Sequence, residues 1–234
     1  MKYKLFGIDV FGIYLHTRLN PRIFQCWFLH LKYLRDILET WASSLPDGKE
    51  KILLDIGSGE NPPYHYFFKN KVAKILTLDS FTKYVDISAP VEKIPLANES
   101  VDFILATQVF EHIKNPFKAS DEIRRVLKTN GKAFISTHGI WEIHRLPKDY
   151  WRFTPDGFCE LFHDFKKVEI IPNGGSILCI SQLLNISSTP LFISFLKLPI
   201  VLVWTSINIL ALFLDKVLKG THKLVINYVV ILEK

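Results

Sequence analysis

The feature that most constrains the fold is an alternation of short apolar runs with segments of helical pattern. Each run is rich in Ile, Leu and Val and is too short for a helix, so it predicts a strand buried on both faces. Helical segments between such strands indicate crossovers that cover both faces of a parallel sheet. We therefore expect a Rossmann-like, doubly wound α/β fold. The predicted strands are KILLDIG (51–57), AKILTLD (73–79), KYVDIS (83–88), VDFILAT (101–107) and GKAFISTH (131–138).

The remaining elements follow from local start and stop signals. Apolar residues at helical spacing predict a helix over residues 24–41. A second helix is expected to begin after Asn115, followed by proline, and to end at Gly131. Segments 166–172 and 222–234 are expected to be strands, whereas the interval between Asp79 and Asp86 is too short for a crossover helix.

Length and composition indicate one domain of 234 residues. We divide it into an N-terminal helical segment (1–48), a core with cofactor and substrate segments (50–175), an apolar insert (176–219) and a last strand (222–234). The cysteines, scattered and three in number, fit neither a disulfide framework nor a metal knuckle, so a reducing, cytoplasmic setting is expected.

Charge and the N-terminus exclude further classes. The net charge is +6, but the lysines are spread along the chain, so no nucleic-acid partner is expected. Residues 1–16 have a basic start and apolar residues, yet Asp9 interrupts the run and no small-residue cleavage site follows. We do not interpret this segment as a signal peptide.

A glycine turn after the first predicted strand indicates a nucleotide site. Gly57 and Gly59 supply a turn at which backbone N–H groups can approach a ligand closely. A dinucleotide fingerprint needs a third glycine at position 62, which is Pro62, and no phosphate-loop Lys follows. Asp79 ends the next predicted strand, where a carboxylate can bind a ribose diol. Together these signals favour a ribose-containing ligand without a pyrophosphate.

These motifs, LDIGSGENP, LTLD and the segment VEKIPLANESVDFILATQVFEHIKNPFKASDEIRRVLKTNGKAFIS, together resemble a known family. Over residues 50–137 the chain is similar to class I S-adenosylmethionine-dependent methyltransferases of the small-molecule type related to the ubiquinone and menaquinone methylases. The resemblance implies a seven-stranded sheet whose last strand is antiparallel. It also implies S-adenosylmethionine as the cofactor.

The resemblance further implies roles for individual residues. Asp55 and the two glycines would line the methionine end of the cofactor, and Asp79 would hold the ribose hydroxyls. Relatives often hold adenine with an Asp-Ala pair, where this chain has Pro90 and Val91, so only the Val91 backbone remains available there. Thr107 and Gln108 would lie beside the cofactor's amino acid and sulfonium. Glu111 and His112 match the family's Glu-His step.

An aromatic and charged segment, residues 138–158, follows the fifth predicted strand and is expected over the cofactor. Its His-x-x-Pro-x-Asp-Tyr-Trp-Arg-Phe-Thr-Pro pattern resembles a methyltransferase subgroup often associated with cell-surface polysaccharide genes. Either histidine can serve as a general base, whereas the spacing shows no metal site. The alternative is that the aromatic residues plug the sheet end while Asp149 and Arg152 pair. The candidate catalytic residues are His138, His144, Asp149 and Tyr150, and the candidate substrate residues are Trp151 and Arg152.

An apolar insert lies between the last two predicted strands. Residues 198–214 are uncharged over nearly the length of a membrane span. One crossing would separate the final strand from its sheet, and polar residues and prolines disfavour two. We expect a hairpin or helix pair in the membrane interface, with Lys216, Lys219 and Lys223 near anionic headgroups. The alternative is a lid packed on the core.

The sequence therefore predicts an S-adenosylmethionine-dependent methyltransferase, attached to the inner face of the membrane from the cytoplasm. Its acceptor would be a glycan, a lipid-linked molecule or another small molecule, and the oligomeric state is left open. Two alternatives remain: a soluble methyltransferase for a small metabolite, and a catalytically silent membrane-bound interaction module.

Overall fold

The computed structural model describes residues 4–5, 8–9, 18–145, 147–191, 196–218 and 221–234. They group into two compact units, one of residues 38–171 and 227–234, and one of residues 1–37 and 172–226. We refer to them as the sheet unit and the helical unit. Most of residues 1–16, which we do not interpret as a signal peptide, lie outside the described residues.

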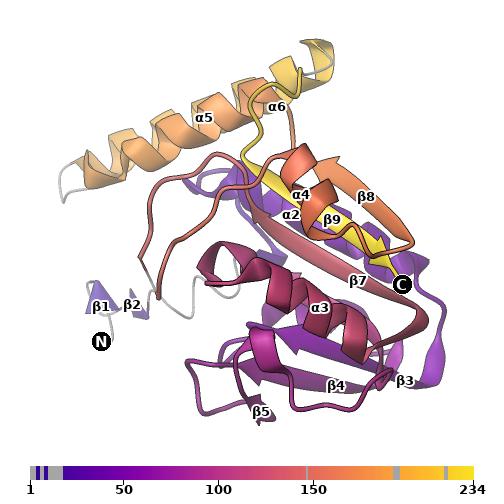
Figure 1. The fold of residues 1–234 in the computed structure, drawn as a ribbon. Coiled ribbons are helices and arrows are strands. Elements are labelled where there is room, and N and C mark those ends of the chain that lie inside the picture. Colours follow the sequence, from indigo (N-terminus) through magenta and orange to yellow (C-terminus); the bar gives the residue numbers. More distant parts are fainter. Residues whose placement is uncertain (1–3, 6–7, 10–17, 146, 192–195, 219–220) are drawn as a thin grey trace. The chain divides into compact units, whose positions relative to one another are not determined.

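The sheet unit contains a seven-stranded sheet in the order β5-β4-β3-β6-β7-β9-β8 (Figure 1). Strands β5, β4, β3, β6 and β7 pair in parallel, and β9 pairs antiparallel with β7. The predicted Rossmann-like fold with an antiparallel last strand is therefore confirmed. The strands are β3 (Gly48–Ile56), β4 (Val72–Asp79), β5 (Ile87–Ser88), β6 (Val101–Thr107), β7 (Leu127–His138), β8 (Lys167–Pro172) and β9 (Asn227–Glu233).

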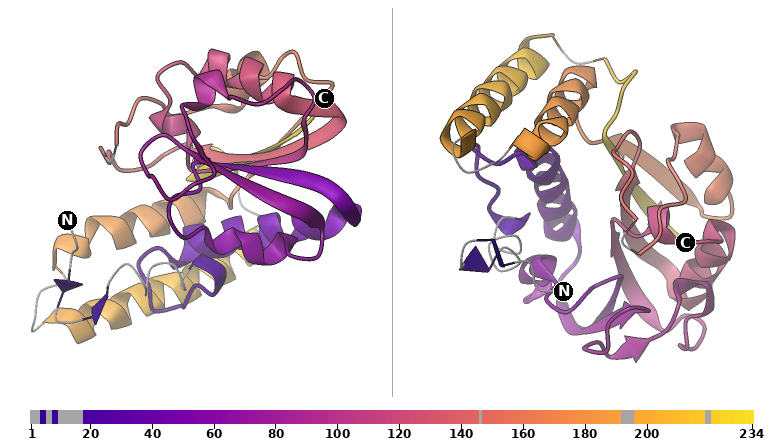
Figure 2. Two further views of the ribbon diagram at one scale, coloured as in Figure 1. Left: turned by 90° about the horizontal axis from the view of Figure 1, so that it is seen from below. Right: turned by 90° about the vertical axis from the view of Figure 1, so that its left-hand side faces the viewer.

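The helices of the sheet unit cover both faces of the sheet (Figure 2). On one face lie α3 (Pro116–Val126) and α4 (Pro155–Leu161). On the other lies the C-terminal part of α2 (Phe28–Ser44), whose Trp41 packs with its ring 5.3 Å from that of Phe134. Short 3-10 helices connect the strands: η1 (Pro63–Phe68), η2 (Val91–Lys93) and η3 (Phe110–His112).

The boundaries of α3 confirm one predicted signal and correct another. Asn115 caps the helix, because its side chain accepts a hydrogen bond of 3.2 Å from the N–H of Lys118. The predicted stop at Gly131 is wrong, since the helix ends at Val126 and Gly131 lies within β7. Leu127 is fully buried and pairs with Val101, so the residues after the helix extend the strand instead.

The edge of the sheet has no helix between β4 and β5, as the short interval predicts. The Asp86 carboxylate instead accepts hydrogen bonds of 2.8 Å from the backbone N–H and the hydroxyl of Thr77. The Asp86 N–H donates back to that hydroxyl over 2.8 Å. The Asp86 side chain therefore fixes the segment between β4 and β5 to β4, directly before the two-residue strand β5 begins.

The helical unit contains α5 (Ser176–Ser187), α6 (Lys197–Leu218) and the first residues of α2. The predicted start of the first helix is wrong by four residues: residues 22–25 form a turn in which the Gln25 N–H donates to the Arg22 carbonyl over 2.9 Å. The same unit includes the short strands β1 (Lys4–Leu5) and β2 (Ile8–Asp9), which pair antiparallel, and η4 (Thr189–Leu191) follows α5.

Candidate functional site

The glycine turn follows β3 at the carboxyl edge of the sheet. Gly57 and Gly59 have φ values of 67° and 63°, which favour glycine. A Cβ at Gly57 would come within 2.5 Å of the Val109 side chain, whereas a Cβ at Gly59 would meet nothing within 4 Å. Gly57 is thus required by packing, and Gly59 faces open space in which a ligand can approach the backbone.

Asp79, at the end of β4, is joined to this turn. One of its carboxylate oxygens accepts a hydrogen bond of 3.2 Å from the Gly59 N–H. The other accepts from the N–H groups of Phe81 and Thr82 at 2.6 and 3.2 Å. Each carboxylate oxygen has two lone pairs, so after these three bonds one lone pair, on the oxygen that accepts from Gly59, remains for a ligand hydroxyl. The structure therefore brings Gly59 and Asp79 together, as the sequence predicts.

Asp55 lies beneath the turn and has a partner that sequence reasoning missed. Its side chain is 5% exposed, and one oxygen lies 2.7 Å from Nε2 of His65 in η1. Burial raises the pKa of the Asp55 carboxyl, while the His65 contact opposes that rise. The pattern around His65 carries no signal of this pairing.

Gln108 follows β6 and occupies a left-handed conformation, with φ of 57°. Its amide nitrogen donates to the Ser136 hydroxyl over 3.2 Å and to the Asn227 side chain over 2.8 Å. Its amide oxygen is buried and has no hydrogen-bond partner among the described residues. Thr107 ends β6 beside it, while Val91 is buried in η2. A left-handed backbone and an unpaired buried oxygen at one residue are typical of functional sites.

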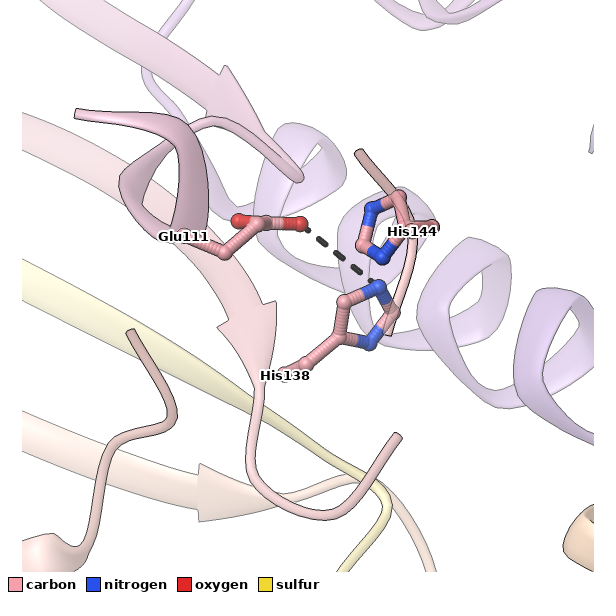
Figure 3. Close-up of side chains that lie close together, drawn as sticks. All are labelled: Glu111, His138 and His144. Atoms are coloured by element: carbon pink, nitrogen blue, oxygen red, sulfur yellow. Dashed lines mark ion pairs between the residues drawn. The ribbon is translucent and has the colours of Figure 1, made fainter. Parts of the chain in front are cut away.

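Three side chains converge next to this edge (Figure 3). Glu111 comes from η3, His138 ends β7, and His144 lies in the loop that follows. A Glu111 carboxylate oxygen lies 3.5 Å from Nε2 of His138, and one ligand-type atom from each of the three residues lies within 4.8 Å of the others. Sequence reasoning noted Glu111 only through the Glu-His step and assigned its side chain no role.

The environment of Glu111 is the most buried in this cluster. The side chain is 0% exposed, and burial raises the pKa of its carboxyl. One oxygen accepts a hydrogen bond of 2.8 Å from the Thr137 hydroxyl, and the other has no hydrogen-bond partner among the described residues. The ring of His138 stacks on that of Trp141 at 4.4 Å between centroids.

The Asp149 carboxylate holds the predicted substrate segment in place through hydrogen bonds. Its two oxygens lie 2.5 and 2.8 Å from the guanidinium nitrogens of Arg152, and one oxygen also accepts the His144 N–H over 2.9 Å. These bonds to Arg152 lower the pKa of the Asp149 carboxyl to about 2. Asp149 therefore orients His144 and Arg152. It is itself largely buried, with its side chain 3% exposed.

Tyr150 and Trp151 are the partly exposed members of that segment, at 46% and 39% exposure. The Tyr150 N–H donates to the Glu111 carbonyl over 2.8 Å, and the Trp151 indole N–H donates to the Ile113 carbonyl over 2.8 Å. The segment is thus fixed beside Glu111 while the Tyr150 phenol ring remains accessible.

Known proteins share the fold of this chain, and the matched region includes the glycine turn. Residues 54–135 match the family model described as "Methyltransferase domain". The chain is 27% identical over 143 residues to an uncharacterised methyltransferase-like protein of Schizosaccharomyces pombe, covering 53% of each. It is 32% identical over 103 residues to the biotin biosynthesis bifunctional protein BioHC of Cellvibrio japonicus, covering 37% of this chain and 20% of that one. The chain therefore spans about half the length of the first of these curated relatives and about a fifth of the length of the second.

Solved structures share the fold at low sequence identity. A SAM dependent methyltransferase from Archaeoglobus fulgidus superposes with a TM-score of 0.57 at 13% identity, covering 97% of this chain and 100% of that one. The [4+2]-cyclase SpnF gives 0.54 at 17% identity, covering 86% and 80%. Because the same fold hosts a cyclase, the activity must be argued from the site. Residues 54–135 thus match a methyltransferase-domain model, and the chain shares its fold with S-adenosylmethionine-dependent methyltransferases.

Proposed function

We propose that the whole protein transfers a methyl group from S-adenosylmethionine to an acceptor at a membrane surface. The observation that carries the proposal is the joined glycine turn and Asp79: the Gly59 N–H donates to the carboxylate that ends the neighbouring strand. In a doubly wound sheet, this carboxyl edge is where ligands bind.

The residues at this edge fit the cofactor. The open space at Gly59 lets the amino-acid part approach the backbone, and the unpaired amide oxygen of Gln108 can accept a hydrogen bond from its ammonium group. The Asp79 carboxylate would accept a ribose hydroxyl. Asp55 would lie beneath the turn, near the methionine end of the cofactor. The Val91 backbone would lie beside the adenine, and the Thr107 side chain would lie beside the sulfonium. The pyrophosphate of NAD has no third glycine to accommodate it.

The acceptor side is formed by the cluster next to that edge. S-adenosylmethionine supplies a sulfonium-activated methyl group, and in-line transfer depends mainly on holding the acceptor atom against it. If the acceptor is a hydroxyl, its proton must leave, and we assign that task to the groups around His138 and His144. Asp149 acts as a positioning residue for His144, while Tyr150 and Trp151 offer faces for a sugar ring or lipid chain.

Arg152, a candidate substrate residue, mainly pairs with Asp149 in the structure. Both of its terminal nitrogens donate to Asp149, and each also donates to a backbone carbonyl over 2.8 Å, one to Trp151 and the other to Glu142. Four of the five guanidinium N–H groups are therefore taken, and the Nε–H is the one left for a phosphate or carboxylate on the acceptor.

Membrane attachment is supported by the distribution of polarity in the helical unit. Gln182, Asn185 and Asn208 are fully buried there, and the Asn185 amide donates to Asn208 over 2.8 Å. The Asn208 amide in turn donates to the Ile23 and Gln25 carbonyls at 2.7 and 3.0 Å. The interior of this unit therefore combines hydrogen-bonded amides with two buried apolar clusters, one that includes Leu178 and Ala211 and one that includes Ile200 and Trp204.

The outer face of the same helices is apolar. α6 is the one helix among the described residues with the length and hydropathy of a membrane span, with a mean hydropathy of 1.9 and 22% of that window buried. We infer that this face lies in the interface of the cytoplasmic leaflet rather than across the bilayer, because β9 must return to the sheet. Its exposed side chains are Leu198, Leu202, Val203, Ile209, Leu210, Phe213, Val217 and Leu218.

The first experiment is a calorimetric titration of the purified protein with S-adenosylhomocysteine and with NAD. We expect binding of the first and not of the second. Asp79→Ala should weaken the binding by about 1.5 to 3 kcal/mol, the range for hydrogen bonds to a charged group. Asp156→Ala, which removes an exposed carboxylate in the first turn of α4, is the matched control. Equal affinity in the two variants would contradict the ribose assignment, and absence of binding by the wild type would favour the silent interaction module.

A further inference from the structure

The Glu111, His138 and His144 cluster has the composition of a metal site as well as of a proton-transfer site. One carboxylate and two imidazoles are the ligand set of many sites for borderline divalent ions such as zinc. The three residues come from a 3-10 helix, a strand end and a loop, so their spacing in sequence carries no metal motif. Only the fold brings them together.

The distances suit one ion. In a tetrahedral zinc site with bonds of about 2.1 Å, ligand atoms lie about 3.4 Å apart. The carboxylate oxygen of Glu111 and Nε2 of His138 lie 3.5 Å apart, which is longer than a good hydrogen bond but close to that spacing. The third ligand atom completes a group within 4.8 Å, so a small rotation of the partly exposed His144 ring closes the set.

Each of the three side chains is also held by a second contact, and for Glu111 and His144 this contact leaves one ligand atom available. Thr137 donates to one Glu111 oxygen, and the buried second oxygen is the one that lacks a hydrogen-bond partner among the described residues. Trp141 stacks on the His138 ring. Asp149 lies 3.5 Å from Nδ1 of His144, which leaves Nε2 for an ion. Carboxylates placed behind a histidine in this way commonly orient metal ligands.

From this arrangement, we propose that Glu111, His138 and His144 bind a divalent transition-metal ion, with zinc as the best fit. Two imidazoles disfavour Mg²⁺ and Ca²⁺, which prefer oxygen ligands. The three ligands leave a fourth position open. Because Asp149 pairs with Arg152, the charge of that guanidinium is largely offset.

The role of the ion rests on the proposed function. An acceptor hydroxyl in the open position would bind the ion and release its proton to solvent. The acceptor oxygen then forms a bond to the methyl carbon as the carbon–sulfur bond breaks, leaving S-adenosylhomocysteine. The ion thereby replaces a free imidazole base by lowering the pKa of the hydroxyl.

The test measures metal binding alone, without cofactor or acceptor, so that failure of the site and failure of methyl transfer are distinguished. Full-length protein treated with a chelator is titrated calorimetrically with Zn²⁺, and Co²⁺ is added separately to record its visible absorption. We expect one Zn²⁺ per chain, a Co²⁺ spectrum typical of four-coordinate nitrogen and oxygen ligation, and no comparable binding of Mg²⁺.

Three variants locate the ion. Glu111→Gln keeps the side-chain shape, and His144→Ala alters a partly exposed loop residue, so at least one of the two should fold; thermal unfolding checks both. Each should weaken Zn²⁺ binding by at least about tenfold, or about 1.4 kcal/mol. His163→Ala removes an exposed histidine outside the cluster and serves as the control. A wild type that takes up no Zn²⁺, or folded cluster variants that bind it as tightly as His163→Ala, would overturn the proposal.

Discussion

The apolar face of α6 allows a quantitative prediction of membrane affinity. Leu202, Leu210 and Phe213 are 58%, 56% and 62% exposed and lie on one side of the helix, at intervals of eight and three residues. Full burial of such side chains contributes about 1.5 to 3 kcal/mol each. Because somewhat more than half of each is available, the three together should contribute about 3 to 5 kcal/mol to partitioning. Replacing all three with glutamine should therefore weaken binding to vesicles by about 100-fold or more.

The assay is sedimentation with vesicles that contain anionic lipid, over a range of lipid concentrations and at low and high salt. Wild-type protein should sediment and be only partly released by high salt, because screening removes the contribution of the lysines and leaves the apolar one. A matched control carries Tyr66→Gln, Tyr84→Gln and Phe117→Gln, which remove three exposed aromatic side chains from the sheet unit.

Two outcomes would refute the reasoning. Wild-type protein that stays in the supernatant would favour a lid role for the insert and a soluble enzyme. Equal losses in the α6 variant and the control would show that the attachment does not reside on α6. Protease treatment of sealed vesicles adds a further check, since cleavage of residues 196–218 from the far side would show a spanning helix instead of an interfacial one.

Three further predictions concern the acceptor side and the helical unit. His144→Ala and Asp149→Ala should abolish or slow methyl transfer while S-adenosylhomocysteine affinity, measured calorimetrically, stays within about threefold; parallel loss of both would make the segment structural support only. Burial, assisted by Arg18, lowers the pKa of His30 to about 3, so the unfolded state takes up a proton more readily below about pH 6.5 and stability falls as the pH falls. By urea unfolding, wild type should lose about 3 kcal/mol more than His30→Asn between pH 7 and pH 4.5, and identical slopes would contradict this. Asn208→Ala should cost about 2 to 4 kcal/mol, because it leaves two carbonyls and the Asn185 amide without their partner; an unchanged urea midpoint would show that water replaces those bonds.

Much of the sheet unit could be predicted from sequence because its signals are local. Apolar runs of strand length marked β3, β4 and β6 closely, and the missing crossover before β5 followed from chain length alone. The errors arose where tertiary pairing decides between two local options. Residues 127–131 have a helix stop signal, yet pairing of Leu127 with Val101 draws them into β7.

The site could be predicted only in part, for a related reason. Gly57, Gly59 and Asp79 follow strand ends, so topology places them together. The pairing of His65 with Asp55 and the convergence of Glu111 with the two histidines depend on side-chain directions in loops and 3-10 helices, which no periodicity encodes. The buried amides of the helical unit were likewise hidden: the polar residues of the insert looked like interruptions of an apolar run, whereas Gln182 and Asn208 hydrogen-bond the segment before α2.

The position of the helical hairpin in the chain has an evolutionary consequence. Residues 173–226 leave the sheet after β8 and return at β9, its neighbour, so the excursion begins and ends on adjacent strands. The entropy of closing such a loop grows only slowly, by about 0.6 kcal/mol for each doubling of its length. Natural selection could therefore lengthen, shorten or exchange this excursion while the sheet keeps its register.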